Sequence, residues 1–448
     1  MKRPPLPPLF FSVRLPTRLA MFWRAHLCRA PGAGDAHKGP LSLIVFRLDS
    51  LGDVVLTTPL FRALKQAHPN SRCTVVVQGR YKPLLVTNPH IDEILTLPQI
   101  RPAWLPRGAR RLLAAVALYW TRLRKRRFDF AISPRWDVDE HLATFLCVLT
   151  DAASRVGYSE TASPAKQRAN RGFDAAYDIC LPPGGVRHEV LRNLAIAEAL
   201  GATAAGAQLE IHLTERDRSK AAKLLARFSD SGVLAAVGIG AQRPGRRWPL
   251  ECYAQTLNRL AREQGVQAVI VCSASELGQA LQLSRLLERR PIILSGAPLR
   301  EVCAVLERCE LFLGNDSGCA HLAAAMHCRT IVISRHPRDG DPNHCNSPLR
   351  FAPYGARVRV LQPATGKDQC RAFCTHAGPH CITQVSVDEV VAAAQMMLNQ
   401  ARPVLLPSRC RTWPEQAARR LLHAHSAEAV QRAVETLFPA TGPPPTQA

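Results

Sequence analysis

Two acidic residues follow an apolar run near the start of the chain. The stretch RLDSLGDVVLTTPL, residues 47–60, comes directly after residues 41–46, which have the composition of a buried β-strand. Asp49 and Asp53 therefore stand where a strand ends and a helical pattern begins, with Gly52 beside the second. A carboxylate at this point can cap the helix, or it can face a ligand and take a proton. The residues alone leave both roles open.

A second polar motif, N-D-S-G-x-x-H, follows an apolar run in the second half of the chain. Asp316, Ser317 and Gly318 open the expected helix, and His321 lies in its first turn. The unpaired N–H groups at a helix N-terminus suit a phosphate, and a glycine lets a diphosphate approach closely. The alternative is that Asp316 or Ser317 only caps the helix and His321 packs on the surface. The motif is neither G-x-G-x-x-G nor a P-loop, which argues against dinucleotide and NTPase sites.

A pair of arginines lies between these two motifs. Arg246 and Arg247 occupy the loop after the expected strand VLAAVGIG, and Pro249 marks the start of the next helix. Loop arginines above the edge of a sheet can hold a diphosphate through paired hydrogen bonds. A solvated basic loop is the alternative interpretation.

The elements that must position these residues alternate between strand and helix, which predicts parallel sheets. We expect an α/β protein with two Rossmann-like, doubly wound domains facing a cleft. Ligands of such sheets bind beyond the carboxyl ends of the strands, where the motifs lie. The predicted divisions are a basic N-terminal extension (1–40), a first domain (41–210), a second domain (211–400) and a Pro/Arg-rich tail (401–448). In the second domain, helices are expected to begin near Pro249, Ser275, Pro298 and Ser317, and a capping box of Ser386 and Glu389 opens the closing helix.

Composition limits the possible functions. The chain has 448 residues, 47% of them hydrophobic, and a formal net charge of +23, which attracts nucleic acid, anionic membranes or phosphorylated substrates. Aromatic residues make up only 6% and the arginines are dispersed, which argues against nucleic-acid binding. The 15 cysteines, an odd number scattered through apolar segments, favour a reducing cytosol. We expect no membrane-spanning helix, and Arg14 and Arg18 interrupt any signal-type apolar core.

The three motifs, in this order, resemble glycosyltransferase family 9, the heptosyltransferases of lipopolysaccharide core assembly. They are R-L-D-S-L-G-D-V-V-L-T-T-P, R-R-W-P and N-D-S-G-x-x-H, and the resemblance extends over residues 41–400. It implies a glycosyltransferase-B fold. It also implies that the domain at 41–210 binds the acceptor and the domain at 211–400 binds a nucleotide-sugar donor.

The resemblance also assigns roles to single residues. Asp53 matches the catalytic base of the family, with Gly52 in the loop beside it. Arg246 falls where many members have a lysine near the donor phosphates. The residues that the resemblance assigns to the donor nucleotide and its phosphates are Arg246, Arg247, Asp316, Ser317, Gly318 and His321. An inverting transfer needs a base and fixed positive potential at the diphosphate, so no metal and no cofactor are expected.

The function implied is transfer of heptose, or a related sugar, from an ADP-sugar to an inner-core lipopolysaccharide acceptor. The partners are then ADP-heptose, a lipid-linked phosphorylated oligosaccharide and the anionic inner-membrane surface, with a cytoplasmic, peripheral location and no nucleic acid. Residues 334–348 replace the short Gly-Thr-x-Pro loop of typical members, which leaves another nucleotide-sugar or acceptor open. A catalytically inactive scaffold is a further alternative, but Asp53 and His321 are intact.

Three other clusters carry residues that could bind a metal or lipid phosphates. Asp137–Asp139 spell D-V-D, which resembles a metal–diphosphate motif but lies in the acceptor domain. The basic helix RGARRLLAAVALYWTRLRKRRFDF is expected to pack on the sheet, and its charged ends can meet lipid phosphates. The segment CRAFCTHAGPHC offers enough ligands for tetrahedral zinc, but its spacings match no zinc pattern, so no metal is assigned. Those ligands are Cys370, Cys374, His376, His380 and Cys381.

Overall fold

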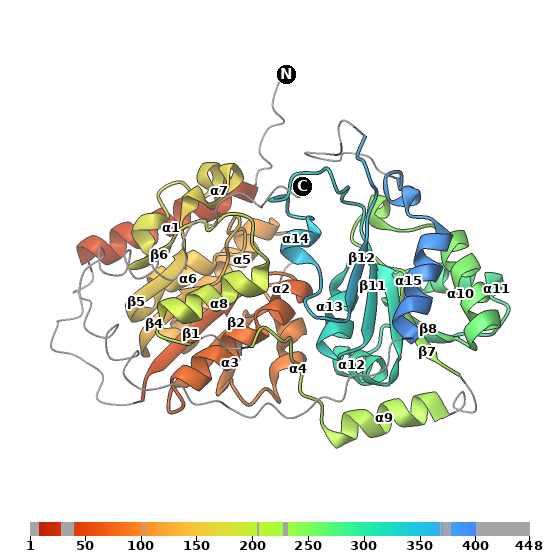
Figure 1. Cartoon of the computed structure of the whole chain (residues 1–448). Coiled ribbons are helices and arrows are strands. Elements are labelled where there is room, and N and C mark those ends of the chain that lie inside the picture. Colours follow the sequence, from red (N-terminus) through yellow and green to blue (C-terminus); the bar gives the residue numbers. More distant parts are fainter. Residues whose placement is uncertain are drawn as a thin grey trace, which may run out of the picture.

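The protein contains two parallel β-sheets, each flanked by helices and lying next to the other (Figure 1). The computed structural model describes residues 9–27, 40–101, 104–203, 206–226, 232–367, 370 and 378–399. The predicted tail at 401–448, and Cys374 and His376, lie outside the described residues. The predicted α/β fold with two doubly wound domains is confirmed.

The first sheet has the strand order β3-β2-β1-β4-β5-β6, and all of its strand pairs are parallel. Alternate residues of the central strand face opposite layers, since Leu43 and Val45 pack in one apolar cluster and Ile44 and Phe46 in another. This is why strand β1 reads as a continuous apolar run. The strands are β1 (Ser42–Arg47), β2 (Arg72–Val77), β3 (Glu93–Thr96), β4 (Arg127–Ser133), β5 (Asp151–Tyr158) and β6 (Ile179–Leu181).

Two layers of helices cover this sheet. Helices α2, α3, α4 and α8 contribute to the cluster that contains Leu43, and α1, α5 and α6 contribute to the cluster that contains Ile44. The helices of the first domain are α1 (Leu9–Leu27), α2 (Leu51–Leu56), α3 (Thr58–Ala67), α4 (Lys82–Leu85), α5 (Arg107–Leu118), α6 (Ala143–Leu149), α7 (Pro164–Ala169) and α8 (Glu189–Ala199). A single π-helical turn, η2 (Tyr119–Leu123), continues α5.

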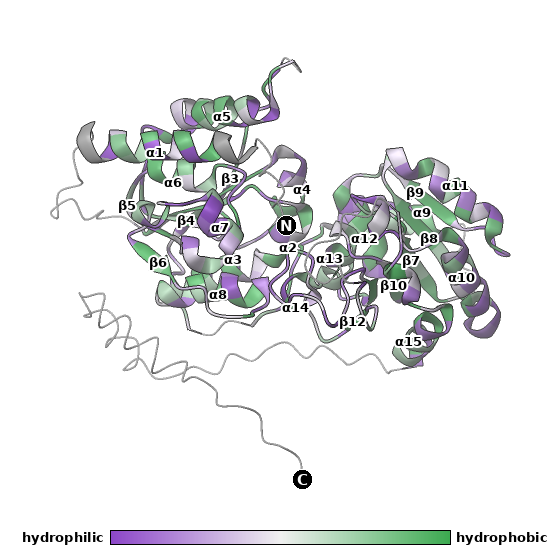
Figure 2. Cartoon of the chain, turned by 90° about the horizontal axis from the view of Figure 1, so that it is seen from above, coloured by the Kyte–Doolittle hydropathy of each residue, from purple (hydrophilic) through white to green (hydrophobic). Residues whose placement is uncertain are grey.

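Helix α1 differs from the expectation that the first 40 residues form a separate extension. It packs against α5 and α6 of the first domain (Figure 2). Val13, Thr17 and Ala20 are buried, at the three- and four-residue spacing that places them on one side of a helix. Arg24 reinforces the contact by donating a hydrogen bond to the carbonyl of Thr150 at 2.7 Å. The Pro-rich composition hid this short helical periodicity.

The second sheet repeats the arrangement with the order β12-β11-β10-β7-β8-β9. Its strands are β7 (Leu234–Gly238), β8 (Gln267–Cys272), β9 (Ile292–Ser295), β10 (Leu311–Asn315), β11 (Arg329–Ile333) and β12 (Val358–Leu361). Its helices are α9 (Glu215–Leu225), α10 (Leu250–Gln264), α11 (Leu277–Leu286), α12 (Leu299–Arg308), α13 (Gly318–Ala325), α14 (Pro348–Phe351) and α15 (Val387–Asn399). Helices α10, α12 and α13 begin directly after Pro249, Pro298 and Ser317, as predicted, whereas Ser275 lies in the short turn η7 (Ala274–Glu276) that precedes α11.

The two domains meet through their inner helices. Helix α2 contacts α13, and α4 contacts α12, so the apolar cluster of the first domain continues into the second. The capping box of Ser386 and Glu389 is confirmed at the start of α15. Within the described residues, no helix combines the length and the apolar character that crossing a bilayer requires.

Candidate active site

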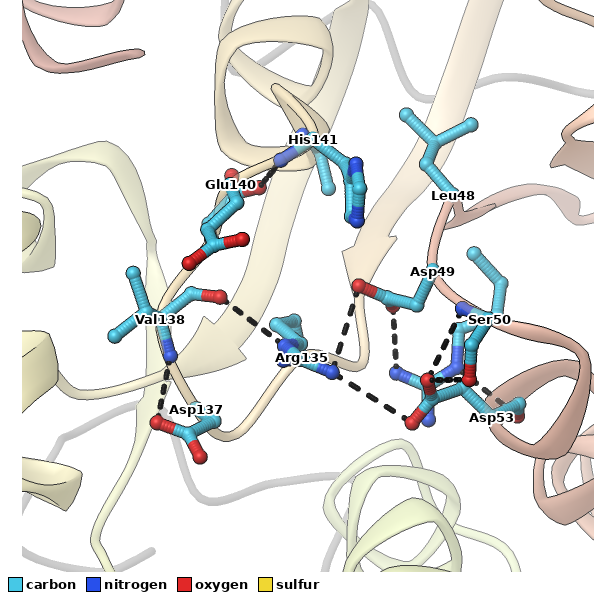
Figure 3. Close-up of polar contacts among 12 residues, drawn as sticks. Leu48, Asp49, Ser50, Asp53, Arg135, Asp137, Val138, Glu140 and His141 are labelled. Carbon is cyan, nitrogen blue, oxygen red and sulfur yellow. Dashed lines mark hydrogen bonds and ion pairs between the residues drawn. The ribbon is translucent and has the colours of Figure 1, made fainter. Parts of the chain in front are cut away.

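Asp53 caps the helix on which it lies. Ser50 precedes α2 and donates two hydrogen bonds to Oδ2 of Asp53, from its backbone N–H at 3.1 Å and from its hydroxyl at 2.7 Å. This capping box shows that Asp53 has the first of the two roles that the sequence left open, that of a helix cap. The other oxygen, Oδ1, faces Arg135, whose Nη1 lies 3.6 Å away (Figure 3). Capping therefore uses Oδ2 and leaves Oδ1 in contact with a cation.

Arg135 joins the two acids of the first motif. Its Nη1 is 3.5 Å from Oδ1 of Asp49, and its Nε donates to the carbonyl of Val138 at 3.1 Å (Figure 3). Arg135 follows strand β4, which pairs with β1, so the carboxyl ends of the two strands bring it to Asp53. Sequence analysis missed this residue. Its only signal is a charged residue directly after an apolar strand, and the strand order was unknown.

Burial and charge act on Asp53 in opposite directions. The side chain is buried, which raises the pKa of the carboxyl group. The positive charges of Arg135 and Arg47, together with the hydrogen bonds from Ser50, outweigh this effect and leave the pKa below its ordinary value. Arg47 is itself fully buried and pairs with Oδ2 of Asp49 at 3.2 Å. Asp53 is thus held as a carboxylate at neutral pH, the state that a general base requires.

His321 lies opposite Asp53 at the start of α13. Only 6% of the residue is exposed, and its Nδ1 is buried with no hydrogen-bond partner among the described residues. Burial lowers the pKa of the imidazole, although Asp316 and Asp53 act to raise it. The ring is therefore neutral at neutral pH. An unpaired ring nitrogen beside a helix N-terminus is available to a ligand.

Two glycines allow the starts of α2 and α13 to touch. A Cβ at Gly52 would lie 2.8 Å from Cδ2 of His321, and a Cβ at Gly318 would lie 2.7 Å from Cδ2 of Leu51. Real Cβ atoms essentially never come so close, so a side chain at either position would force a displacement. The glycines of the first and third motifs thus serve the contact between the domains.

Arg246 reaches the start of α13 from the turn η6 (Pro244–Arg246). Its Nη2 donates to Oδ2 of Asp316 at 2.5 Å, and its Nε is buried with no partner among the described residues. Asn315, which sequence analysis did not single out, fixes this turn. It accepts a hydrogen bond from the N–H of Trp248 and donates one to the carbonyl of Ile239, both at 2.8 Å.

Two of the predicted phosphate ligands have other contacts. Arg247 donates through Nε and Nη2 to the carbonyl of Ala241, at 3.2 and 3.0 Å, and through Nη1 to Gln279 at 3.4 Å. It stabilises its own loop and does not join Arg246. Ser317 occupies the N-cap position of α13, but its hydroxyl makes no capping bond. The structure thus brings Asp53, Gly52, Arg246, Asp316, Ser317, Gly318 and His321 to one interface and leaves Arg247 at its margin.

The D-V-D sequence is engaged within the protein. Asp139 accepts hydrogen bonds from the backbone N–H groups of Ala143 and Thr144, at 3.2 and 2.8 Å, and so caps α6. Asp137 pairs with Arg350, whose Nη1 lies 3.3 Å from its Oδ2. Both carboxylates are thus engaged by groups of the protein, and the place of the D-V-D sequence in the acceptor domain had already argued against a metal–diphosphate motif.

The atypical segment at 334–348 leads into a contact between the domains. Arg350, on α14, is fully buried and also pairs with Glu189 of the first domain at 3.0 Å. The guanidinium groups of Arg192 and Arg350 both lie over the indole of Trp136, with their Cζ atoms 3.6 and 4.4 Å from the ring centre. This segment therefore packs beside the connection that carries Arg135.

Comparison with known proteins shows which family model, relatives and solved structures the chain resembles. Residues 116–375, more than half of the chain, match the family model described as glycosyltransferase family 9 (heptosyltransferase). Lipopolysaccharide heptosyltransferase 2 of Salmonella typhimurium is 25% identical over 378 residues, covering 80% of this chain and 99% of that protein. Among solved structures, a glycosyl transferase family 9 protein from Veillonella parvula superposes with a TM-score of 0.66 at 21% identity, covering 81% of this chain and 98% of that one. The E. coli heptosyltransferase WaaC with ADP gives a TM-score of 0.59 at 18% identity, with 80% and 100% covered.

Proposed function

Because the chain belongs to glycosyltransferase family 9 and is a glycosyltransferase, we propose that it transfers heptose from ADP-heptose to an inner-core lipopolysaccharide acceptor. The observation that carries the proposal is the contact between Gly52 and His321, which sets the carboxylate of Asp53 beside the N-terminus of α13. A proton acceptor and a phosphate site then share one interface. The similarity to the lipopolysaccharide heptosyltransferase of Salmonella supports the sugar and the acceptor, and the WaaC structure with ADP supports the nucleotide.

Asp53 is the general base in this proposal. As the acceptor hydroxyl attacks the anomeric carbon, its proton passes to the carboxylate, and the bond from that carbon to the diphosphate breaks on the opposite face. The configuration of the sugar inverts. Arg135 holds the carboxylate in its charged state and in place through contacts at 3.5 and 3.6 Å with Asp49 and Asp53.

The leaving diphosphate gathers charge at the start of α13. The N–H groups of the first turn, the ring of His321 and the guanidinium of Arg246 supply fixed positive potential or hydrogen-bond donors there. Asp316 orients Arg246 through its ion pair at 2.5 Å. The buried Nε of Arg246 and Nδ1 of His321 are the unpaired groups that a phosphate would satisfy.

The proposal also locates the enzyme at the cytoplasmic surface of the inner membrane, where a lipid-linked phosphorylated acceptor is accessible. Four large apolar side chains of α1 are exposed at helical spacing, and we call them the outer apolar stripe: Leu15, Leu19, Phe22 and Trp23. This stripe is more apolar than the buried side of the helix, which is formed by Val13, Thr17 and Ala20. Exposed Trp120 lies in η2, which continues neighbouring α5, and the chain after it carries four exposed basic residues, Arg122, Arg124, Lys125 and Arg127. Apolar and basic groups of this kind suit an anionic bilayer surface.

Donor binding tests the proposal directly. ADP should raise the melting temperature of the protein, because a ligand that binds only the native state stabilises it. His321→Ala and Arg246→Ala should each reduce that shift, whereas Arg262→Ala, on exposed α10, should leave it unchanged. GDP and UDP belong in the same experiment, since the segment at 334–348 leaves another nucleotide-sugar possible. Normal ADP binding by both site variants would refute the phosphate site.

The product identifies the sugar and the acceptor. Lipopolysaccharide from a strain that lacks this enzyme should be truncated at the inner core, and mass spectrometry should show the loss of one heptose. Loss of a unit with another mass would refute the assignment of heptose while leaving the glycosyltransferase activity intact.

A further inference from the structure

The segment between β12 and α15 brings two thiols and an imidazole together. The ligand atoms of Cys370, His380 and Cys381 all lie within 4.8 Å of one another. The sulfur of Cys370 is 3.5 Å from Nε2 of His380, and Nδ1 of that ring is 3.0 Å from the sulfur of Cys381. Sequence analysis assigned no metal here, because the spacings match no known pattern.

These cysteines differ from the other buried cysteines among the described residues. The others belong to one of the three apolar clusters of the protein, where a thiol packs as a small hydrophobic group. They are Cys73, Cys147, Cys272, Cys303, Cys309 and Cys328. Cys370 and Cys381 are equally buried, at 8% and 3% exposed, but belong to none of these clusters.

Polar side chains as well as apolar groups border Cys370 and Cys381. Both cysteines line a pocket together with His380, Arg335 and the imidazoles of His336 and His344, which stack with their ring centres 5.3 Å apart. Simple apolar packing therefore does not account for burying two sulfurs at this place. A bound zinc ion would account for it, because thiolates and imidazole are ligands that zinc prefers in proteins.

We propose that Cys370, His380 and Cys381 bind a zinc ion. Nitrogen and sulfur ligands of one tetrahedral zinc, at about 2.0 and 2.3 Å from the ion, lie about 3.5 Å apart. The separation between the sulfur of Cys370 and Nε2 of His380 has this value, whereas the sulfur of Cys381 lies 3.0 Å from Nδ1 of the same ring and must move toward Nε2 for all three residues to bind one ion. Two thiolates balance the charge of the ion, and the fourth coordination position faces the pocket.

The position of the site indicates a structural role. Gly245, the neighbour of Arg246 in the turn η6, lines the same pocket. A few residues beyond Cys381, the carbonyl of Val385 accepts a hydrogen bond from Nε1 of Trp248 at 3.0 Å. Zinc would thus fasten the segment before α15 behind the turn that carries Arg246. Its loss should weaken donor binding and lower the melting temperature without removing the base, Asp53.

Elemental analysis tests the proposal. Full-length protein, purified without added metal or chelator, should contain about one zinc per chain. Cys370→Ser and Cys381→Ser should each reduce metal affinity at least about tenfold, the smallest loss typical even of outer partners of a metal site. Cys180→Ser, which changes an exposed cysteine of the first domain, is the matched control and should retain the metal.

A second measurement does not depend on the folding of a variant. Wild-type protein stripped with a chelator and reloaded with Co²⁺ should show thiolate-to-cobalt charge-transfer absorption, and the chelator should lower its melting temperature. Wild-type protein that holds no metal, even after incubation with Zn²⁺, would overturn the proposal. Thiol counting that reveals a disulfide between Cys370 and Cys381, or serine variants that retain full metal content, would also overturn it. A stoichiometric metal other than zinc bound by the same thiols would correct its identity.

Discussion

The imidazole of His321 lies against the backbone of Gly52, so that a Cβ at position 52 would stand 2.8 Å from Cδ2 and 2.9 Å from Nε2 of the ring. The two residues come from different domains and from motifs far apart in the sequence. The glycine therefore sets how closely the carboxylate of Asp53 can approach the N-terminus of α13. This contact links the two halves of the proposed reaction.

Gly52→Ala should separate the domains at this point. The added methyl group overpacks a buried contact, and we expect a loss of about 1–3 kcal/mol in the free energy of unfolding. Urea denaturation measures it. In a protein that already carries His321→Ala, the methyl group has space, and the same change should cost less than about 0.5 kcal/mol. An equal cost in both backgrounds would mean that the ring of His321 is not the obstacle.

Asp53→Asn should separate capping from catalysis. Asparagine accepts hydrogen bonds at a helix start about as well as aspartate, but it cannot take a proton. Folding and ADP binding should remain, while turnover falls at least about a hundredfold in an assay with acceptor.

Asp217→Asn is the matched control for Asp53→Asn. Asp217 accepts hydrogen bonds from the backbone and hydroxyl of Thr214, at 2.9 and 2.6 Å, in a capping box like that of Asp53, and it pairs with Arg300. It should therefore report the effect of losing a capping carboxylate and its ion pair at a place outside the proposed site. Asp49→Asn is unsuitable as a control because Asp49 contacts Arg135. Near-normal turnover of Asp53→Asn would show that Asp53 is only a cap.

Arg135→Gln should change the pH dependence of turnover. Burial raises the pKa of Asp53, and Arg135 is the largest influence that lowers it. Removing this charge should raise the pKa and move the acid limb of kcat/KM to higher pH. Arg135→Lys should restore much of the original profile. An unchanged acid limb would show that Arg135 does not act through Asp53.

The lowered pKa of Asp53 also makes the stability of the folded protein depend on pH. Because the pKa of folded Asp53 lies below that of the unfolded chain, its contribution is present above the unfolded pKa and disappears as pH falls through the folded value. The wild type should thus lose stability at acid pH more steeply than Arg135→Gln. Urea midpoints across that pH range measure the difference.

Leu19→Glu and Trp120→Glu should weaken membrane binding. Each removes an exposed apolar side chain from the surface formed by α1 and α5, and withdrawing such a group from a bilayer costs about 1.5–3 kcal/mol, roughly tenfold or more in partition. Co-sedimentation with vesicles rich in anionic phospholipid measures this loss. Leu281→Glu, on exposed α11 of the second domain, should bind like the wild type. Wild-type protein that ignores anionic vesicles would contradict the proposed location.

The sequence by itself determined the alternation of strands and helices and the position of each motif at a strand end. Apolar runs such as residues 41–46 are local patterns, and in a parallel sheet the carboxyl ends of the strands share one edge. Asp53 could therefore be assigned to that edge of the first sheet, and Ser317 and Arg246 to that edge of the second, without knowledge of their contacts. The helix starts after Pro249 and Ser317 follow from the local preference of proline and serine for helix N-termini, although the hydroxyl of Ser317 makes no capping bond.

Only the tertiary structure decided which residues meet. Arg135 reaches Asp53 because β4 pairs with β1, a strand order that no local pattern encodes. Arg247 turns from the phosphate site because its own loop offers the carbonyl of Ala241. The sulfur of Cys370 lies 3.5 Å from Nε2 of His380, and both residues line a pocket with Gly245 of η6. Such contacts depend on chain folding over long separations, so residue type and spacing alone could not reveal them.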